Sequence, residues 1–165
     1  MNRFISVAIA LLMSSTLSYA WDATVDGPDV FGKIKVVALD ATFNSSLVVQ
    51  CDSETELFVA FIFKKKEFQE ITEVPAKLYI KTAEASPTVL EATFRNWNDN
   101  YAGVVATGRN DEVIKLVNAI GLAKGKIEVG YDVAGLRESA SFGSRKSTQT
   151  IKTVFDKCKL LLPAQ

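Results

Sequence analysis

The sequence predicts a mostly β domain of the α+β class, an antiparallel two-layer β-sandwich with two helices. Three observations carry this prediction. Apolar and polar residues alternate along much of the chain from residue 34 onward, which is the period of a strand with one covered face. Polar, turn-forming residues separate these runs. Only two stretches change to the helical period of apolar residues three or four positions apart.

The strand pattern begins at residue 34 and is strongest in the middle of the chain. The segment Leu57–Phe63 is apolar at every position, so we expect it to be covered on both faces and to form the centre of the sheet. Residues 126–133 alternate cleanly and predict another strand. The remaining predicted strands are residues 34–39, 47–51, 77–81, 88–94 and 102–107.

Two helices are predicted, near residues 111–121 and near residues 148–160. Asn110 is the expected N-cap of the first, and Gly121 or Gly125 can end it. Ser147 is the expected N-cap of the second, and in this register Cys158 lies on its apolar, inward-facing stripe.

Residues 1–20 have the layout of a secretory signal peptide: a charged start, a short apolar core and small residues before Trp21. We therefore expect cleavage before Trp21, and a single β-rich domain over residues 21–165. A buried N-terminal helix or a retained anchor are the alternatives. Export places the protein in the periplasm of a Gram-negative cell or outside the cell, with no stable membrane insertion after signal cleavage.

The chain has two cysteines, Cys51 and Cys158. In an oxidising compartment pairing is the default, and the bond would tie an early strand to the last helix. Two free buried thiols remain the alternative. Closing a loop of this length would remove unfolded-chain entropy worth about 4 to 5 kcal/mol.

The chain lacks the residues of the commonest catalytic sites. It has no histidine, so neither a Ser-His-Asp nor a Cys-His relay can be built. Glycine-rich phosphate loops are absent, and 19 basic side chains balance 19 acidic ones, which gives no footprint for nucleic acid. We therefore predict a protein that is not an enzyme and has no cofactor and no metal site. A hydrolase that uses two carboxylates is the remaining enzymatic alternative.

The segment Asn96–Asn100 is rich in side chains that favour turns. Its alternating oxygen ligands invite comparison with a calcium loop, but it lacks the central glycine and the final glutamate, so a hairpin turn is the better interpretation. Trp97 next to this turn is either a lid on the core or an exposed binding aromatic. The candidate binding surface consists of Trp97, Asn98, Asp99 and Tyr101.

The chain also resembles the VasI family of periplasmic proteins associated with type VI secretion. The resemblance runs from Trp21 through the apolar strand that ends in Cys51, resumes at residues 92–98 around the second tryptophan, and ends with residues 141–143 and the segment that carries Cys158. It implies a non-enzymatic accessory role, with another protein, such as a secretion-apparatus component, as partner. The alternative is a periplasmic inhibitor or immunity protein directed against a cell-wall hydrolase.

Overall fold

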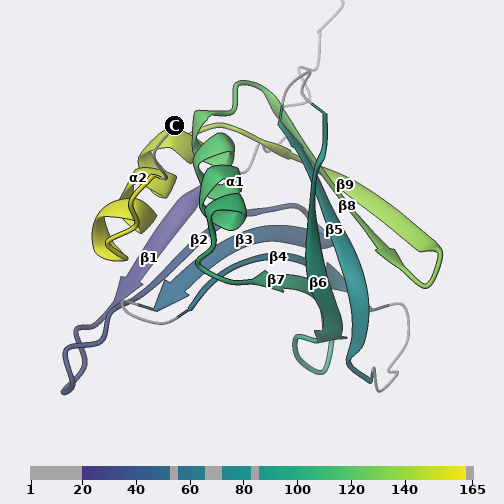
Figure 1. Ribbon diagram of the computed structural model, residues 1–165, viewed down its shortest axis with the longest axis horizontal. Helices are drawn as coiled ribbons and strands as arrows, with labels where there is room; N and C mark the ends of the chain where they lie inside the picture. The colour runs from purple at the N-terminus through teal and green to yellow at the C-terminus, as the bar shows by residue number, and fades with distance from the viewer. Residues whose placement is uncertain (1–19, 53–55, 66–71, 83–85, 163–165) are drawn as a thin grey trace, which may run out of the picture.

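The computed structural model describes residues 20–52, 56–65, 72–82 and 86–162, and Figure 1 shows its nine strands and two helices. The expected signal peptide lies outside the described residues, apart from Ala20. The strands are β1 (Asp22–Asp26), β2 (Lys35–Ala41), β3 (Ser45–Asp52), β4 (Leu57–Lys64), β5 (Val74–Thr82), β6 (Thr88–Asn96), β7 (Tyr101–Thr107), β8 (Lys126–Val133) and β9 (Leu136–Gly143); the helices are α1 (Asp111–Leu122) and α2 (Ser147–Lys157).

All nine strands belong to one antiparallel sheet in the order β1-β2-β3-β4-β7-β6-β5-β8-β9. The mostly β fold class is confirmed, but the two-layer sandwich is not: the single sheet curls into a half-barrel. Alternation along a strand shows that one face is covered, but it does not show whether a second sheet or the curl of the same sheet supplies the cover. Here both helices and the far side of the curl supply it (Figure 1).

The main core lies on the concave face, which we call the inner face of the sheet. It joins inward side chains of β2 to β9 with one side of each helix. A smaller apolar cluster lies on the opposite, outer face, where Phe58, Ala60 and Ile62 of β4 pack with Val48 and Val105. The predicted double coverage of β4 is therefore confirmed, because its alternate residues belong to the two clusters.

The two helices cover the part of the inner face that β1 to β4 form. Asn110 caps α1 as predicted, since its Oδ1 accepts a hydrogen bond from the Val113 N–H at 2.9 Å. The N-cap predicted at Ser147 is wrong: Lys146, in the left-handed region with φ 65°, precedes the helix and Ser147 is its first residue. Among the described residues, no helix is long and apolar enough to cross a membrane.

Gly121 does not end α1 but lies inside it. A Cβ at this position would stand 2.9 Å from Cβ and Cγ2 of Ile151 in α2. The absence of a side chain therefore lets the two helices approach, and α1 continues to Leu122 before Ala123 caps it.

The predicted disulfide between Cys51 and Cys158 is confirmed. Its Cα atoms are 6.3 Å apart, and 107 positions separate the two residues in the sequence. Both cysteines are fully buried, one near the end of β3 and the other directly after α2. The bond fixes the last helix against the inner face of the sheet.

The two strands at the margins of the sheet, β1 and β9, were not among the strands predicted from periodicity, and only residues 141–143 of β9 were expected as a strand, from the family resemblance. β1 is only five residues long and mostly exposed, and β9 reads Leu-Arg-Glu-Ser-Ala-Ser-Phe-Gly with little apolar alternation. An edge strand has a neighbour on one side only, so it needs fewer apolar residues than a central strand. These edges shape the candidate site.

Candidate binding site at the open seam of the half-barrel

The two margins of the curled sheet meet at Gly143, the last residue of β9. The Trp21 indole Nε1 donates to the Gly143 carbonyl at 2.8 Å, and the Gly143 N–H donates to Asp40 Oδ2 at 3.0 Å. The Trp21 N–H also donates to the Arg145 carbonyl at 3.0 Å. Side chains from the start of the domain and from β2 thus join β9 to the opposite margin.

Asp40 is a buried acid at this junction, with 3% of its surface exposed. Burial disfavours its charged form and raises the pKa of the carboxyl, while hydrogen bonds from the backbone of Gly143 and Ala41 oppose this rise. Its Oδ1 atom has no hydrogen-bond partner among the described residues. The junction is therefore held by a carboxyl group whose protonated form the fold favours.

The β8–β9 hairpin determines which groups of β9 face the seam. Its two-residue turn, Ala134 with φ 50° and Gly135 with φ 87°, has both residues in the left-handed region, as a type I′ turn requires. In such a hairpin the flanking pair, Val133 and Leu136, exchanges hydrogen bonds, and every second pair along the ladder does the same. The N–H and C=O groups of alternate β9 residues therefore point away from β8: Arg137, Ser139, Ser141 and Gly143.

The hydrogen bonds of Gly143 agree with this register, since its N–H and C=O both point to the opposite margin. For Ser139 and Ser141 the structure gives no backbone hydrogen bond on that side, within the residues that it describes. From Gly143 towards the hairpin turn, β9 thus becomes a bare strand edge. We call the gap beside this edge the seam.

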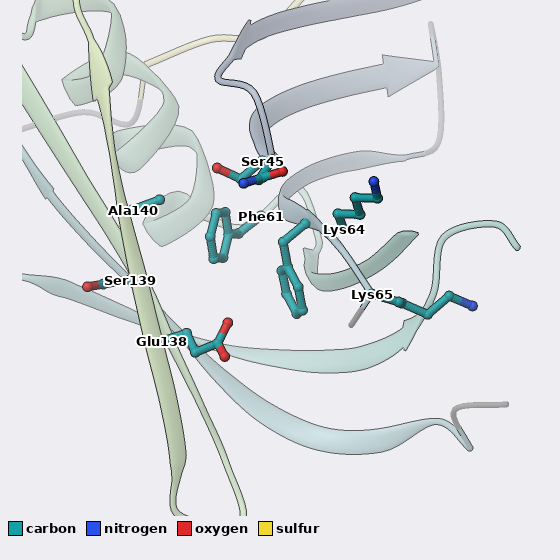
Figure 2. A pocket seen from close by; sticks show the side chains of 9 residues that line it. Ser45, Phe61, Lys64, Lys65, Glu138, Ser139 and Ala140 are labelled. Carbon is teal, nitrogen blue, oxygen red and sulfur yellow. The ribbon is translucent and has the colours of Figure 1, made fainter. Parts of the chain in front are cut away.

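A cavity of about 360 Å³ opens at the seam, between β9 and the region where β3 begins and β4 ends (Figure 2). Its volume is within the range of about 300 to 1,000 Å³ that is usual for ligand sites. It is lined by Asn44, Ser45, Phe61, Phe63, Lys64, Lys65, Glu138, Ser139 and Ala140.

Aromatic rings form the floor of this cavity and the core below it. Phe63 stacks on Tyr131, with ring centroids 4.9 Å apart and planes 7° from parallel, and also on Phe94 at 6.1 Å. Phe61 meets Phe142 edge-on at 6.1 Å. These rings come from β4, β6, β8 and β9, so the curl of the sheet is what brings them together.

Glu138 is the acidic residue of the cavity lining, and its carboxylate points into the cavity (Figure 2). It accepts a hydrogen bond from the Tyr131 hydroxyl on the paired strand. Burial, and then the charge and hydrogen bond of Glu138, raise the pKa of Tyr131 to about 12. The hydroxyl therefore stays protonated near neutral pH and acts as a donor to this carboxylate.

The two lysines of the lining, Lys64 and Lys65, differ in where their side chains lie. Lys65 Nζ donates to the Asn96 side-chain oxygen at 3.1 Å, and the Lys64 side chain points away from the cavity (Figure 2). Among the described lining residues, Glu138 is the acidic side chain that points into the cavity.

An exposed aromatic residue stands beside the seam, in the β2–β3 turn. Phe43 is 92% exposed and adjoins Asn44 of the cavity lining. The turn is held by the Thr42 N–H, which donates to the Ser45 carbonyl at 2.7 Å, and by a hydroxyl–hydroxyl hydrogen bond of 2.8 Å between the same two residues. A large apolar side chain on a well-defined turn is a feature of interaction surfaces.

The candidate surface predicted around Trp97 lies elsewhere, on the outer cluster and at the β6–β7 turn. Trp97 packs edge-on against Phe58, with ring centroids 6.0 Å apart, and lies over Gly103. Asn98 Oδ1 accepts hydrogen bonds from the N–H groups of Asn100 and Tyr101, both at 2.9 Å, so the predicted hairpin turn is confirmed.

These contacts give both residues roles in the fold. Trp97 covers the outer cluster, and Asn98 stabilises the β6–β7 turn. Tyr101 also packs on the outer cluster, whereas Asp99 is exposed. A role of this surface in binding stays a prediction. The surface does not belong to the lining of the seam cavity.

A second hollow, of about 330 Å³, lies beside β5, β6 and β8 and has a polar lining that includes Lys77, Glu91, Asp132 and Arg137. Arg137 Nε and Asp132 Oδ2 form an ion pair of 2.6 Å between the two strands of the β8–β9 hairpin. In the part of the chain that the structure describes, no three Asp, Glu or Cys side chains are grouped to hold a metal ion.

Comparison with protein-family models, with curated proteins and with solved structures finds no match for this chain. The site is therefore argued from its own geometry. Sequence reasoning missed the seam because Glu138, Ala140 and Phe142 share one face of a strand too polar to stand out. The signal that could have found it is the Ala134-Gly135 turn after a clear strand, which demands a returning strand.

Proposed function

We propose that this chain is an exported, non-enzymatic binding protein that recognises another protein at the seam of its half-barrel. Three features that occur in one place carry the proposal. β9 is the last strand of the described sheet, so one of its edges has no paired strand there. An aromatic cavity lies beside this edge, and the exposed Phe43 adjoins Asn44 on the other side of the cavity. Strand edges and exposed apolar side chains are the usual means by which a sheet recruits another chain.

A binding role fits the chemistry of the cavity better than catalysis does. Hydrolysis by carboxylates needs two acidic groups on either side of the bond to be cut. Among the described residues that line the cavity, Glu138 is the acidic one, and its neighbours are aromatic, amide, hydroxyl and lysine side chains. This composition suits recognition, in which aromatic walls bury area and one charge fixes orientation.

The disulfide between Cys51 and Cys158 supports the export part of the proposal, because such bonds persist in oxidising compartments. Periplasmic or secreted delivery agrees with the signal peptide predicted for residues 1–20. As the resemblance to VasI proteins implies, the proposed partner is a component of the secretion apparatus.

The proposal is tested by photocrosslinking in the cell. Phe43 and Phe31 are both exposed phenylalanines on turns, at 92% and 83%, so each can be replaced by p-benzoyl-phenylalanine with little disturbance. The seam predicts one discrete adduct from position 43 and from Ser139, and none of that mass from position 31. Adducts that arise from position 97 or 31 but not from the seam would contradict the proposal.

The alternative function, inhibition of a cell-wall hydrolase, is favoured by the β8–β9 hairpin. The hairpin tip presents Leu136, 72% exposed, on a turn that Asp132 Oδ1 fixes by accepting from the Gly135 N–H at 3.0 Å. A rigid projecting turn loses little entropy when it enters an active-site cleft. Loss of lytic activity when the purified protein is mixed with a hydrolase, reversed by Leu136→Asp, would favour this alternative.

A further inference from the structure

We propose that cleavage of the chain before Trp21 creates an α-ammonium group that forms an ion pair with the buried carboxylate of Asp40. Export would thereby complete the junction at which the seam ends. The inference rests on the export part of the proposed function, because it requires processing between Ala20 and Trp21. It concerns the regulation of the seam, since the two sheet margins would be joined most firmly in the processed protein.

Asp40 has a carboxylate oxygen without a partner. Its Oδ2 accepts a hydrogen bond from the Gly143 N–H at 3.0 Å, but its Oδ1 has no hydrogen-bond partner among the described residues, and only 3% of the residue is exposed. In the described part of the chain, no lysine or arginine forms an ion pair with Asp40. Leaving a carboxylate oxygen buried without a donor is costly, so an additional donor at this point would stabilise the fold.

Trp21 lies opposite this carboxyl group in the strand register. The first residue of β1, Asp22, pairs with Leu39 of β2, and one further step of this antiparallel register places Trp21 opposite Asp40. Opposite residues have Cα atoms about 4.5 to 5.5 Å apart, and their side chains lie on the same face. Both residues are buried and both bind Gly143, Trp21 through its indole and Asp40 through its carboxylate. The main-chain nitrogen of Trp21 is therefore a near neighbour of the Asp40 side chain.

Cleavage changes the number of hydrogens on this nitrogen. While Ala20 is attached, as it is in the structure, the Trp21 nitrogen is an amide with a single hydrogen, which it donates to the Arg145 carbonyl at 3.0 Å. After cleavage it is an ammonium group that carries three hydrogens and a positive charge at neutral pH. One hydrogen can keep the bond to Arg145, and the others become available to Asp40 Oδ1. The cleavage itself thus produces the donor that the buried carboxylate lacks.

The two charged groups compensate each other for the loss of water. A carboxylate or an ammonium group that is buried alone loses its hydration, and a pair that also forms hydrogen bonds recovers much of this loss. Trp21 is 1% exposed, so the new charge would form in a place with little access to solvent. The ion pair should lower the pKa of Asp40 and raise the pKa of the new α-amino group. The raised pKa of Asp40 is therefore a property of the unprocessed chain, in which the Trp21 nitrogen is uncharged.

The ion pair acts on the seam because both of its partners hold Gly143. In the unprocessed chain, hydrogen bonds from the Trp21 indole and to the Asp40 carboxyl join β9 to the opposite margin. An additional charge-assisted hydrogen bond between Trp21 and Asp40 would fix these two partners relative to each other, and such bonds are stronger than neutral ones. A firmer junction defines where the bare edge of β9 begins. The seam would thus reach its final form after export.

The test compares exported proteins that are produced from the full chain and isolated in the oxidised state. Mass spectrometry identifies the first residue of the unchanged protein after processing. One variant carries Gly-Ser inserted between Ala20 and Trp21, which moves the new amine two residues away from Asp40. A second variant is Asp40→Asn. The matched control is Asp22→Asn, because Asp22 is also an acid beside Trp21 but is exposed.

We expect the unchanged protein to begin at Trp21. Its α-amino group should react with an acylating reagent at pH 8 about tenfold more slowly than that of Asp40→Asn, because a paired ammonium group is not nucleophilic. The control Asp22→Asn should react at nearly the rate of the unchanged protein, and the amine of the Gly-Ser variant should react as fast as that of a free peptide. The Gly-Ser insertion should also lower the melting temperature by roughly a few degrees, and this loss should disappear when Asp40 is replaced by asparagine.

Three results would overturn the inference. Processing at a residue other than Trp21 would remove the amine from the junction. Equal acylation rates in the unchanged protein and the Gly-Ser variant, a comparison that does not depend on the folding of Asp40→Asn, would show that the amine is not paired. A melting-temperature loss from the insertion that is the same with and without the Asp40 carboxylate would show that this group is not its partner. If these failures occur while photocrosslinking from position 43 still yields its adduct, the junction is independent of processing and the proposed function stands.

Discussion

The two ends of the half-barrel interior are filled in different ways. At one end α1 and α2 cover the inner face, and the disulfide holds the second helix to β3. At the other end no helix of the described residues covers the inner face, and the aromatic rings of Phe61 and Phe63 line an open cavity. The first end is closed by covalent and apolar packing. At the second end, the hydrogen bonds of Gly143 join the two sheet margins in the part of the chain that the structure describes.

This difference separates stability from recognition. Changes at the helix-covered end should unfold the protein, and changes at the seam should alter binding while the fold persists. The predictions that follow test this separation, beginning with the largest expected effect.

Removal of the disulfide should cause the largest loss of stability. Cys158→Ser opens a loop of 107 positions, which should lower the free energy of unfolding by about 4 to 5 kcal/mol through the entropy of the unfolded chain. Thermal unfolding in non-reducing buffer measures the effect. A melting temperature equal to that of the unchanged protein would show that the bond does not hold the helix-covered end together.

Gly121→Ala should destabilise the packing between α1 and α2. The new methyl group would overlap Ile151, and overpacking of this kind costs about 1 to 3 kcal/mol, which exceeds or offsets the gain of about 1 kcal/mol in helix propensity. In the double variant with Ile151→Ala, which removes the Cγ2 atom that the new methyl group would meet, the two losses should be less than additive. A more stable Gly121→Ala protein would contradict the close approach of the helices.

Asp40→Asn tests the junction at Gly143 through its pH dependence. Because burial raises the Asp40 pKa, the folded state holds this proton more tightly than the unfolded state does, and Asp40 lowers stability as pH rises through and above 3.8. The variant lacks this loss, so its melting temperature relative to the unchanged protein should rise between pH 3 and pH 7, by roughly a few degrees.

The control variant, Asp132→Asn, should change in stability with pH in the opposite direction. A hydrogen bond from Arg137 lowers the pKa of Asp132, so that carboxylate contributes stability above its ordinary pKa that is lost as pH falls. Asp132→Asn should therefore become relatively less stable towards pH 7. If both variants changed in stability with pH in the same direction, the conclusion that burial raises the pKa of Asp40 would be wrong.

Glu138→Gln should have the smallest effect on stability, because Glu138 is exposed at the seam. It should instead lower the pKa of Tyr131 from about 12 towards 10.0, since the nearby negative charge and the hydrogen bond to the carboxylate both oppose ionisation of the phenol. Ultraviolet titration of the tyrosines, with Tyr131→Phe to assign the signal, measures this shift. An unchanged Tyr131 titration would contradict the hydrogen bond between the Tyr131 hydroxyl and the Glu138 carboxylate.

Sequence patterns predicted the central part of the fold but not its margins. The apolar run Leu57–Phe63 and the cap at Asn110 were predicted because burial on two faces and capping leave local marks. The curl of the sheet could not be predicted, because it depends on contacts between Trp21 and Gly143, which are 122 positions apart. Gly121 was misassigned as a helix end because a close helix crossing and a helix terminus both favour glycine.

The candidate site shows the same limit. Trp97 attracted attention because of its residue type, yet its ring covers the outer cluster. Glu138 lies in a polar stretch, and only the hairpin register turns its side chain to the inner face beside Phe63. A site made by strands that are distant in sequence has no local pattern.

The most direct test of the open seam is residue-resolved amide hydrogen exchange of β9 in the oxidised protein without a partner. The register predicts alternation: the amides of Ala140 and Phe142, which face β8, and of Gly143, which donates to Asp40, should exchange slowly, and those of Ser139 and Ser141 should exchange fast. Equal, strong protection of Ser139 and Ala140 would show that the seam is already closed and would contradict the account.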